Sequence, residues 1–132
     1  MSAPRHWLLK SEPDVFSYAD LERAPRRTTS WGGVRNYQAR NLLRDELALG
    51  DLVLYYHSNA EPSGVAGIAR VVRAGYPDPT QFDPADGYFD PASTREAPRW
   101  FAVDVQAVEP LRRFVALDEL RGEARLADMV LL

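Results

Sequence analysis

Residues 23–44 carry the side chains whose types and spacing first point to a chemical function. This stretch holds six arginines and no carboxylate, although the net charge of the whole chain is −3. Trp31, Asn36, Tyr37 and Gln38 lie among these arginines. Guanidinium groups contact phosphates, flat rings stack on bases, and amides pair with base edges. The stretch therefore predicts a groove that holds a nucleic-acid backbone and stacks one base.

A second candidate group lies at the end of the first apolar segment, where Lys10, Ser11 and Glu12 precede Pro13. Lys10 is the exception among sixteen basic residues, because all the others are arginine. A lysine supplies a compact point donor with a tunable pKa, whereas the alternative is a chance lysine at a strand end. With His57, these three residues could form an acid–base or nucleophilic group. Consecutive strand residues point to opposite faces, however, so we expect no shared reaction centre and no catalysis.

Composition limits the other function classes. The 132-residue chain has no cysteine and only two histidines, so we expect no metal and no cofactor. No apolar run approaches the roughly 18 residues that cross a bilayer, and the N-terminus has no signal-peptide pattern. We expect a single domain over residues 1–132, cytoplasmic and without a membrane partner. The sequence pI near 5.4 argues against coating of nucleic acid by charge alone, so only about two or three of the six arginines should contact phosphates.

Hydrophobic periodicity predicts an α+β domain built on a curled sheet or open barrel. The expected strands are residues 6–11, 51–57, 65–73 and 100–109, with the middle two forming an antiparallel hairpin. The expected helices are residues 17–23, 37–47, 117–120 and 124–131. Ser17 and Asp20 resemble a capping box, Asn36 is the expected N-cap of the second helix, and Gly50 its C-terminal stop. Residues 28–30 are expected to be a polar loop.

Residues 76–99 form a long segment with five prolines, three of them in Asp-Pro pairs. Loops of this length are usually functional or disordered. Tyr76, Phe82, Tyr88 and Phe89 provide anchors that a disordered linker would lack. We therefore expect an ordered flap over residues 76–99.

Four motifs together resemble the EVE domain: WLLKSEPDVF at 7–16, SWGGVRNYQARN at 30–41, GDLVLYYHSNAEPSGVAGIAR at 50–70 and YPDP at 76–79. The resemblance covers nearly the whole chain. It implies a PUA-like fold, a small mixed or antiparallel β-barrel flanked by short helices and related to the YTH and ASCH domains. It also implies DNA or RNA binding, with a modified base, in particular a modified cytosine such as 5-methylcytosine, held in a pocket. The family pattern continues past Leu132 with a further strand and helix, which leaves open where this domain ends.

Residue types and the resemblance agree on one pocket between the end of the first strand, the Trp31 loop and residues 55–58. The expected base-binding or nucleic-acid-binding side chains are Lys10, Ser11, Glu12, Trp31, Val34, Arg35, Asn36, Tyr37, Arg40, Tyr55, His57 and Ser58. Each has a structural alternative: Trp31 and Tyr37 could pack in the protein, and His57 could be hydrogen-bonded inside the barrel. Tyr55 and Tyr56 point to opposite faces, so at most one should line a pocket.

We therefore expect a non-catalytic module that takes a modified base into an aromatic and polar pocket. The alternative is a small hydrolase acting on a modified nucleoside through Lys10 and Glu12, because some ASCH relatives are thought to use a lysine and a glutamate in this way. A protein-interaction module that uses the flap is a third alternative. The sequence distinguishes neither DNA from RNA nor one base modification from another.

Overall fold

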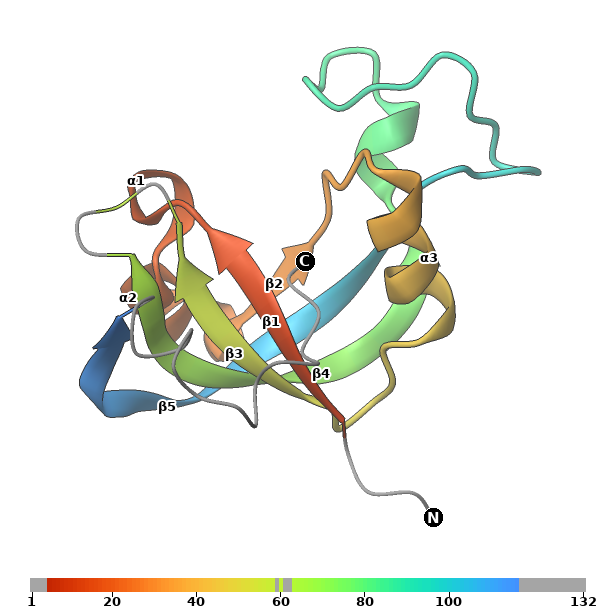
Figure 1. Cartoon of the computed structure of the whole chain (residues 1–132). Coiled ribbons are helices and arrows are strands. Elements are labelled where there is room, and N and C mark those ends of the chain that lie inside the picture. The colour runs from red at the N-terminus through yellow and green to blue at the C-terminus, as the bar shows by residue number, and fades with distance from the viewer. Residues whose placement is uncertain (1–4, 59, 61–62, 117–132) are drawn as a thin grey trace.

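A computed structural model describes residues 5–58, 60 and 63–116 (Figure 1). Five strands form one mixed sheet in the order β1-β3-β4-β5-β2. The strands are β1 (His6–Ser11), β2 (Thr28–Trp31), β3 (Leu52–His57), β4 (Gly64–Pro77) and β5 (Phe101–Ala116). β1 is parallel to β3, and the other neighbouring strands are antiparallel. The predicted α+β architecture is confirmed, and the strands of the described residues do not close into a barrel, so β1 and β2 are the two edges of the described sheet.

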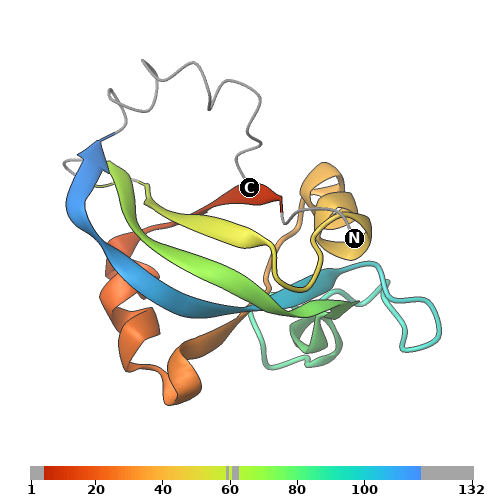
Figure 2. The same cartoon turned by 90° about the horizontal axis from the view of Figure 1, so that it is seen from below.

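Bulges and length explain why this sheet curls. The β4 and β5 strands are 14 and 16 residues long, longer than the predicted segments 65–73 and 100–109. Their pairing shifts register at several points, and each such irregularity bends the strands and increases their twist. Figure 2 shows β4 and β5 curving together along the sheet. The curl turns edges β1 and β2 toward the same side of the molecule.

Local sequence signals account for the helices, which are α1 (Pro13–Phe16), α2 (Tyr18–Arg23), α3 (Tyr37–Asp45) and the 3₁₀ turns η1 (Pro25–Arg27) and η2 (Pro79–Phe82). The predicted capping box holds, because the side chains of Ser17 and Asp20 each accept from the other's backbone amide. Asn36 accepts from the amide of Ala39, as expected of the α3 N-cap. Figure 1 shows α1 and α2 at one end of the sheet and α3 with the flap at the other.

Two expectations about local structure are wrong, and one helix was not predicted. Residues 28–30 are not a loop but belong to β2. Their polar side chains did not indicate a strand, because β2 is stabilised by backbone pairing with β5. The first strand is followed by the unpredicted helix α1, which Pro13 begins because proline fits the first helical position. The α3 helix ends at Asp45 with Glu46 as its C-cap, so Gly50 does not stop it.

The core lies between the inner face of the curled sheet and helices α2 and α3. Leu9, Leu21, Val53 and Val105 are among its fully or almost fully buried side chains. Each such aliphatic side chain contributes about 1.5–3 kcal/mol relative to an exposed position. Trp7 and Leu9 are buried on one face of β1, as the strand pattern predicted. None of the described helices is long and apolar enough to cross a membrane.

The Tyr55-Tyr56 pair departs from simple strand alternation. The pairing of β3 with β4 shifts register between these two residues, and both side chains are buried. Tyr55 belongs to the main core cluster. The helices expected at 117–120 and 124–131, and the question of where the domain ends, lie outside the described residues.

Candidate functional site

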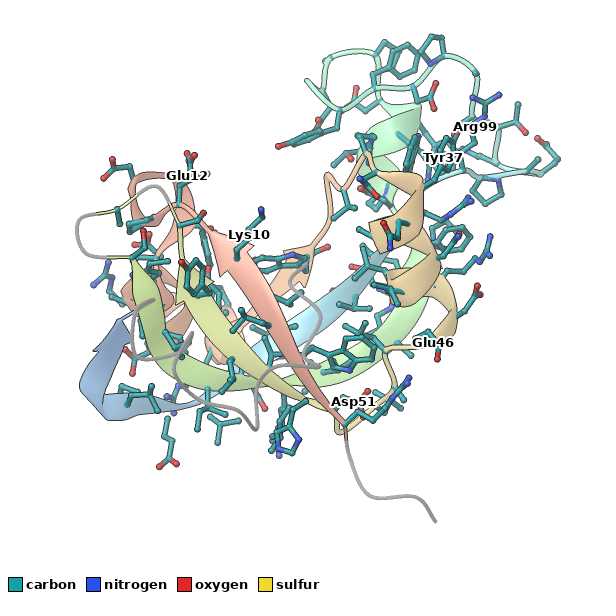
Figure 3. The ribbon with its side chains drawn as sticks, viewed as in Figure 1. Lys10, Glu12, Tyr37, Glu46, Asp51 and Arg99 are labelled. Atoms are coloured by element: carbon teal, nitrogen blue, oxygen red, sulfur yellow. The ribbon has the colours of Figure 1, made fainter. Side chains whose placement is uncertain are left out.

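A pocket of about 430 Å³ lies where the sheet fails to close, between the ends of β1 and β2. This volume is within the range of roughly 300–1,000 Å³ that small-molecule sites have. The lining residues come from β1, α1, β2, the loop that follows β2 and the flap: Lys10, Ser11, Val15, Phe16, Thr29, Ser30, Trp31, Gly32, Val34 and Tyr88. Figure 3 shows the Lys10 side chain pointing to the open side of the sheet, between α1 and the flap.

Trp31 forms the aromatic wall of the pocket. Its ring stands edge-on to the buried ring of Tyr55, with centroids 5.4 Å apart at 87°. The Tyr55 hydroxyl donates to the carbonyl oxygen of Phe16 (2.8 Å), and the Ser11 hydroxyl donates to the same oxygen (2.8 Å). Burial raises the pKa of Tyr55 to about 12, so its hydroxyl stays a donor at neutral pH. These contacts fix the ring of Trp31 and the end of α1 relative to each other.

The segment 55–58 lies behind the pocket wall rather than on its surface. The backbone amide of Tyr18 donates to Nε2 of His57 (3.1 Å), and the His57 ring lies edge-on to Tyr55. Burial lowers the pKa of His57, which keeps Nε2 available as an acceptor. The amide of Ser58 donates to the carbonyl of Ser11 (3.0 Å). Tyr55, His57 and Ser58 therefore support the wall and do not line the pocket.

Two glycines let the flap approach the Trp31 loop. A Cβ atom on Gly32 would lie 2.9 Å from Oδ2 of Asp78, and one on Gly33 would lie 2.8 Å from the Tyr88 ring. Gly33 also has φ of +73°, which side chains rarely adopt. The two glycines therefore serve a close approach between the Trp31 loop and the flap.

Asp78 and Arg35 connect that loop to the flap. Asp78 is buried and accepts from the amide of Gly33 (2.7 Å), from Thr80 and from Arg35 (3.2 Å). Burial alone would raise the pKa of Asp78, but these hydrogen bonds outweigh it and hold the pKa below its usual value. Arg35 also donates to the carbonyl of Tyr88 (2.6 Å). Its guanidinium is therefore committed to the flap and is not a lining residue of the pocket.

Tyr37 and Arg40 form a stack on the far side of this connection. The ring of Tyr37 stacks on Trp100 with centroids 4.8 Å apart, and the guanidinium carbon of Arg40 lies 4.9 Å from the centre of the Tyr37 ring. Arg40 also donates to the carbonyl of Arg99 (2.7 Å). Tyr37 is half exposed, yet these neighbours occupy its ring, so it supports the base of the flap.

The arginines of residues 23–44 are largely neutralised in the fold. Four of the six make ion pairs with nearby carboxylates, in the pairs Arg23–Asp20, Arg27–Glu22, Arg35–Asp78 and Arg44–Asp45. A paired arginine contributes less net charge to its surroundings than the sequence count implies. The stretch is therefore not one continuous cationic groove, although Trp31 and Val34 within it reach the pocket.

The structure brings together four of the predicted site residues at the pocket: Lys10, Ser11, Trp31 and Val34. Glu12 is exposed beside the pocket without lining it, and Asn36 is used as the α3 cap. Sequence reasoning missed Thr29 and Ser30 because β2 was taken for a loop. It also missed Tyr88, although the aromatic anchors of the flap were the signal that could have identified it. Base-binding roles for all predicted residues remain predictions.

Within the described part of the chain, no three or more metal-ligating side chains cluster to hold an ion. What the arrangement offers is a stacking surface, hydroxyl groups from Ser11, Thr29 and Ser30, and one ammonium group from Lys10. This set can hold a flat polar ring next to a negative charge.

Comparison with known proteins places this arrangement in a family. The sequence model of the EVE domain matches residues 5–132. Human thymocyte nuclear protein 1 is 46% identical over 126 residues, covering 89% of this chain and 56% of that protein. The chain spans about half the length of the curated relatives it matches.

Solved structures agree in fold. A hypothetical protein from Leishmania major superposes with a TM-score of 0.86 at 45% identity, covering 97% of this chain and 80% of that one. Human THYN1 protein, solved in complex with DNA containing 5-methylcytosine, superposes with a TM-score of 0.83 at 46% identity, covering 89% of this chain and 73% of that one. The resemblance identified from the four motifs is therefore confirmed, and this chain belongs to the EVE domain family.

Proposed function

We propose that this domain binds nucleic acid and takes a modified base, in particular a modified cytosine such as 5-methylcytosine, into the pocket beside Trp31. The observation that carries the proposal is the pocket itself, which combines an aromatic wall, hydroxyl groups and a single ammonium group at the open end of the sheet. The similar human protein crystallised with DNA containing 5-methylcytosine supports this assignment.

Trp31 is the residue that would stack on the base. A base–aromatic stack is worth about 1–3 kcal/mol, whereas extruding a base from a duplex costs a few kcal/mol. The edge-on contact with Tyr55 already fixes the Trp31 ring, so base binding costs little further side-chain entropy. Single-stranded or mismatched targets should therefore bind more tightly than a fully paired duplex.

Selectivity for a methyl group has a physical limit. The apolar side chains of Val15, Phe16 and Val34 offer surface that a methyl group could bury. One buried methyl contributes about 0.8 kcal/mol, which corresponds to roughly fourfold in affinity. An unpaired base-edge group costs more, about 1–3 kcal/mol, so hydrogen bonds to the hydroxyls should discriminate between bases more strongly than size does.

We also propose that the domain is non-catalytic and acts in the cytosol. Two candidate catalytic groups have structural partners: the Ser11 hydroxyl donates to the Phe16 carbonyl, and Nε2 of His57 accepts from the Tyr18 amide. Lys10 lines the pocket, but Glu12 does not. These contacts favour binding over the alternative hydrolysis through Lys10 and Glu12.

The test measures the affinity of short single-stranded DNA and RNA oligonucleotides that differ only in one central cytosine, modified or unmodified. We expect tighter binding of a modified form by about fourfold. Trp31→Ala should weaken binding by about 5- to 150-fold, while Trp31→Phe, which keeps a flat ring, should retain most of the affinity. Mass spectrometry of the recovered oligonucleotides should show no change. Equal affinities for modified and unmodified oligonucleotides, or a product of altered mass, would contradict the proposal.

A further inference from the structure

The outer face of the sheet carries two basic side chains of β4, Arg70 and Arg73, that do not line the pocket. Arg70 of β4 pairs in register with Gln106 of β5, and Arg73 pairs with Asp104. Gln106 and Asp104 are two residues apart on one strand and therefore share a face, which places both arginines on that face. The intervening Val105 is buried in the core on the opposite face. The two arginines are thus on the solvent side of the sheet.

The backbone of exposed Arg26 lies at the edge of the same face. The side-chain amide of Gln106 donates to the carbonyl oxygen of Arg26 (3.0 Å) while its oxygen accepts two hydrogen bonds from Arg70 (2.8 and 3.1 Å). Arg26 and Arg27 have φ of 57° and 55°, a left-handed conformation that costs stability in residues with a side chain. Such unfavourable backbone is often retained where a side chain must be presented. We name Arg26, Arg70 and Arg73 the arginine face.

The arginine face differs in its charge balance from the four ion-paired arginines of residues 23–44, although Arg26 belongs to that stretch too. Within the described ranges, no carboxylate lies within 4.0 Å of the guanidinium groups of Arg26, Arg70 and Arg73. The carboxylate that lies among them, Asp104, accepts from the hydroxyl of Tyr76. Glu109 pairs with Ile68 and therefore lies on the same face as Arg70, so three guanidinium groups face the two carboxylates of Asp104 and Glu109. The count still leaves one net positive charge on this face, in a protein whose total charge is −3.

A short chain of contacts connects the arginine face to the pocket. The guanidinium of Arg73 lies 3.7 Å from the centre of the Tyr76 ring. The Tyr76 hydroxyl is hydrogen-bonded to the hydroxyl of Ser30 (2.7 Å), and Ser30 lines the pocket. A strand with one base in the pocket could therefore continue over Tyr76 and onto Arg73 without leaving the protein surface.

We infer that the arginine face binds the phosphodiester backbone of the nucleic acid whose base enters the pocket, an inference that rests on the proposed function. Arginine binds phosphate oxygens in a bidentate geometry, and such contacts position a strand without reading its sequence. The arginine face should therefore add affinity equally for modified and unmodified targets, while the pocket supplies the discrimination between them.

The test uses the double variant Arg70→Gln/Arg73→Gln and single-stranded DNA oligonucleotides with a central 5-methylcytosine or cytosine, over a range of salt concentrations. Losing two phosphate contacts should reduce the slope of log affinity against log salt by about 1.4. Affinity at low salt should fall about tenfold or more, by the same factor for both oligonucleotides. Arg70→Lys/Arg73→Lys, which keeps both charges, should retain the slope of the wild type. Thermal melting of each variant establishes that it is folded.

The matched control is Arg5→Gln/Arg95→Gln, which removes the same charge from the residue that precedes β1 and from the flap. Arg5 is already paired with Glu46, and the guanidinium of Arg95 lies over Phe82. This control should leave the salt slope unchanged. An equal loss in the control pair would mean that overall charge, not this face, drives binding, and would overturn the inference.

The two hypotheses fail in different ways. An unchanged slope and affinity in Arg70→Gln/Arg73→Gln would overturn the arginine face, while a wild-type preference for 5-methylcytosine would still uphold the pocket. A reduced slope without any wild-type preference would support the arginine face and contradict the proposed base recognition. A loss confined to the modified oligonucleotide would also overturn the inference, because phosphate contacts act on both targets.

Discussion

The pocket has two sides that are held by different forces. On the sheet side, Trp31 and the end of α1 rest on the buried ring of Tyr55, which also packs edge-on against Tyr18. On the flap side, Tyr88 is held through Asp78 and Arg35, both of which act by hydrogen bonds and charge. The sheet side belongs to the main core cluster, and the flap side is a polar assembly beside it.

Gln81 shows how far the flap depends on polar contacts. Its side chain is fully buried, and its amide nitrogen donates to the carbonyls of Asp78 (2.7 Å) and Trp100 (2.8 Å). Its amide oxygen accepts from the backbone amides of Arg99 and Trp100. A buried polar network is rigid while every partner is present and costly once one is removed. Loss of one polar partner should therefore open the flap side locally, whereas loss of a packed side chain on the sheet side should lower the stability of the whole fold.

The largest expected effect comes from breaking the sheet side with Tyr55→Ala. Removing a buried aromatic ring leaves a cavity and typically costs about 3–5 kcal/mol in the free energy of unfolding. Urea unfolding measures this loss. Tyr55→Phe keeps the ring and removes only the hydrogen bond to the Phe16 carbonyl, so about 1 kcal/mol is expected. Similar losses for the two variants would show that packing does not dominate this side.

Asp78→Asn should break the flap side at an intermediate level. The change removes the charge that Arg35 faces and turns part of an acceptor group into a donor, at a cost of about 1–3 kcal/mol. Hydrogen exchange should speed up at the amides of Gly33 and Thr80, while amides of β3 keep their protection. Asp83→Asn is the matched control, because the carboxylate of exposed Asp83 accepts, among the described residues, only from the nearby backbone amide of Ala85. Loss of protection throughout the sheet would show that the two sides are not separable.

Gly33→Ala should have a smaller and more localised effect. Its Cβ atom would meet the Tyr88 ring at 2.8 Å with φ at +73°, and the left-handed conformation alone costs about 1–2 kcal/mol. Gly50→Ala measures the cost of the left-handed backbone alone, because Gly50 has φ of +87° and no atom within 4 Å of an added Cβ. Gly87→Ala has neither problem and should be neutral. Thermal melts of the three variants should rank in that order, and a Gly33 variant as stable as the Gly87 variant would contradict the close packing of Tyr88.

Local signals explain what could be predicted from the sequence. The Ser17 capping box, the Asn36 cap and the alternation of Trp7 and Leu9 depend on neighbours in the chain, and all three appear in the fold. The strand β2 was missed because its four residues, three of them polar, become a strand only through pairing with β5, which lies far away in sequence.

The pocket shows the same limit. Lys10, Ser11, Trp31 and Val34 could be placed there from their motifs, but Arg35 could not be told apart from a ligand-binding arginine. Its partner Asp78 lies 43 residues away, and only the fold brings the two together. Tyr88 likewise reaches the pocket only because Gly32 and Gly33 admit the flap. The cluster of arginines in the sequence therefore does not show which guanidinium groups are paired within the fold, because long-range contacts such as Arg35–Asp78 decide that.

Acid should destabilise the two sides of the pocket at different pH values, and this is the smallest of the expected effects on the free energy of unfolding. Burial lowers the pKa of His57 below 6.5, so under pH 6.5 the unfolded chain binds a proton that the folded protein resists, and the free energy of unfolding falls. The pKa of Asp78 is lowered despite burial, so its contribution is complete above about 3.8 and is lost as the pH falls through its folded value. As the pH falls, the sheet side should therefore weaken first, starting below pH 6.5, and the flap side only below about 3.8. Urea unfolding at pH 7, 5 and 3 measures the free energy of unfolding and checks this order. His57→Gln should remove part of the decrease in that free energy between pH 7 and 5 and leave the decrease below pH 4 in place. An unchanged pH profile in this variant would mean that His57 does not set the acid response of the sheet side.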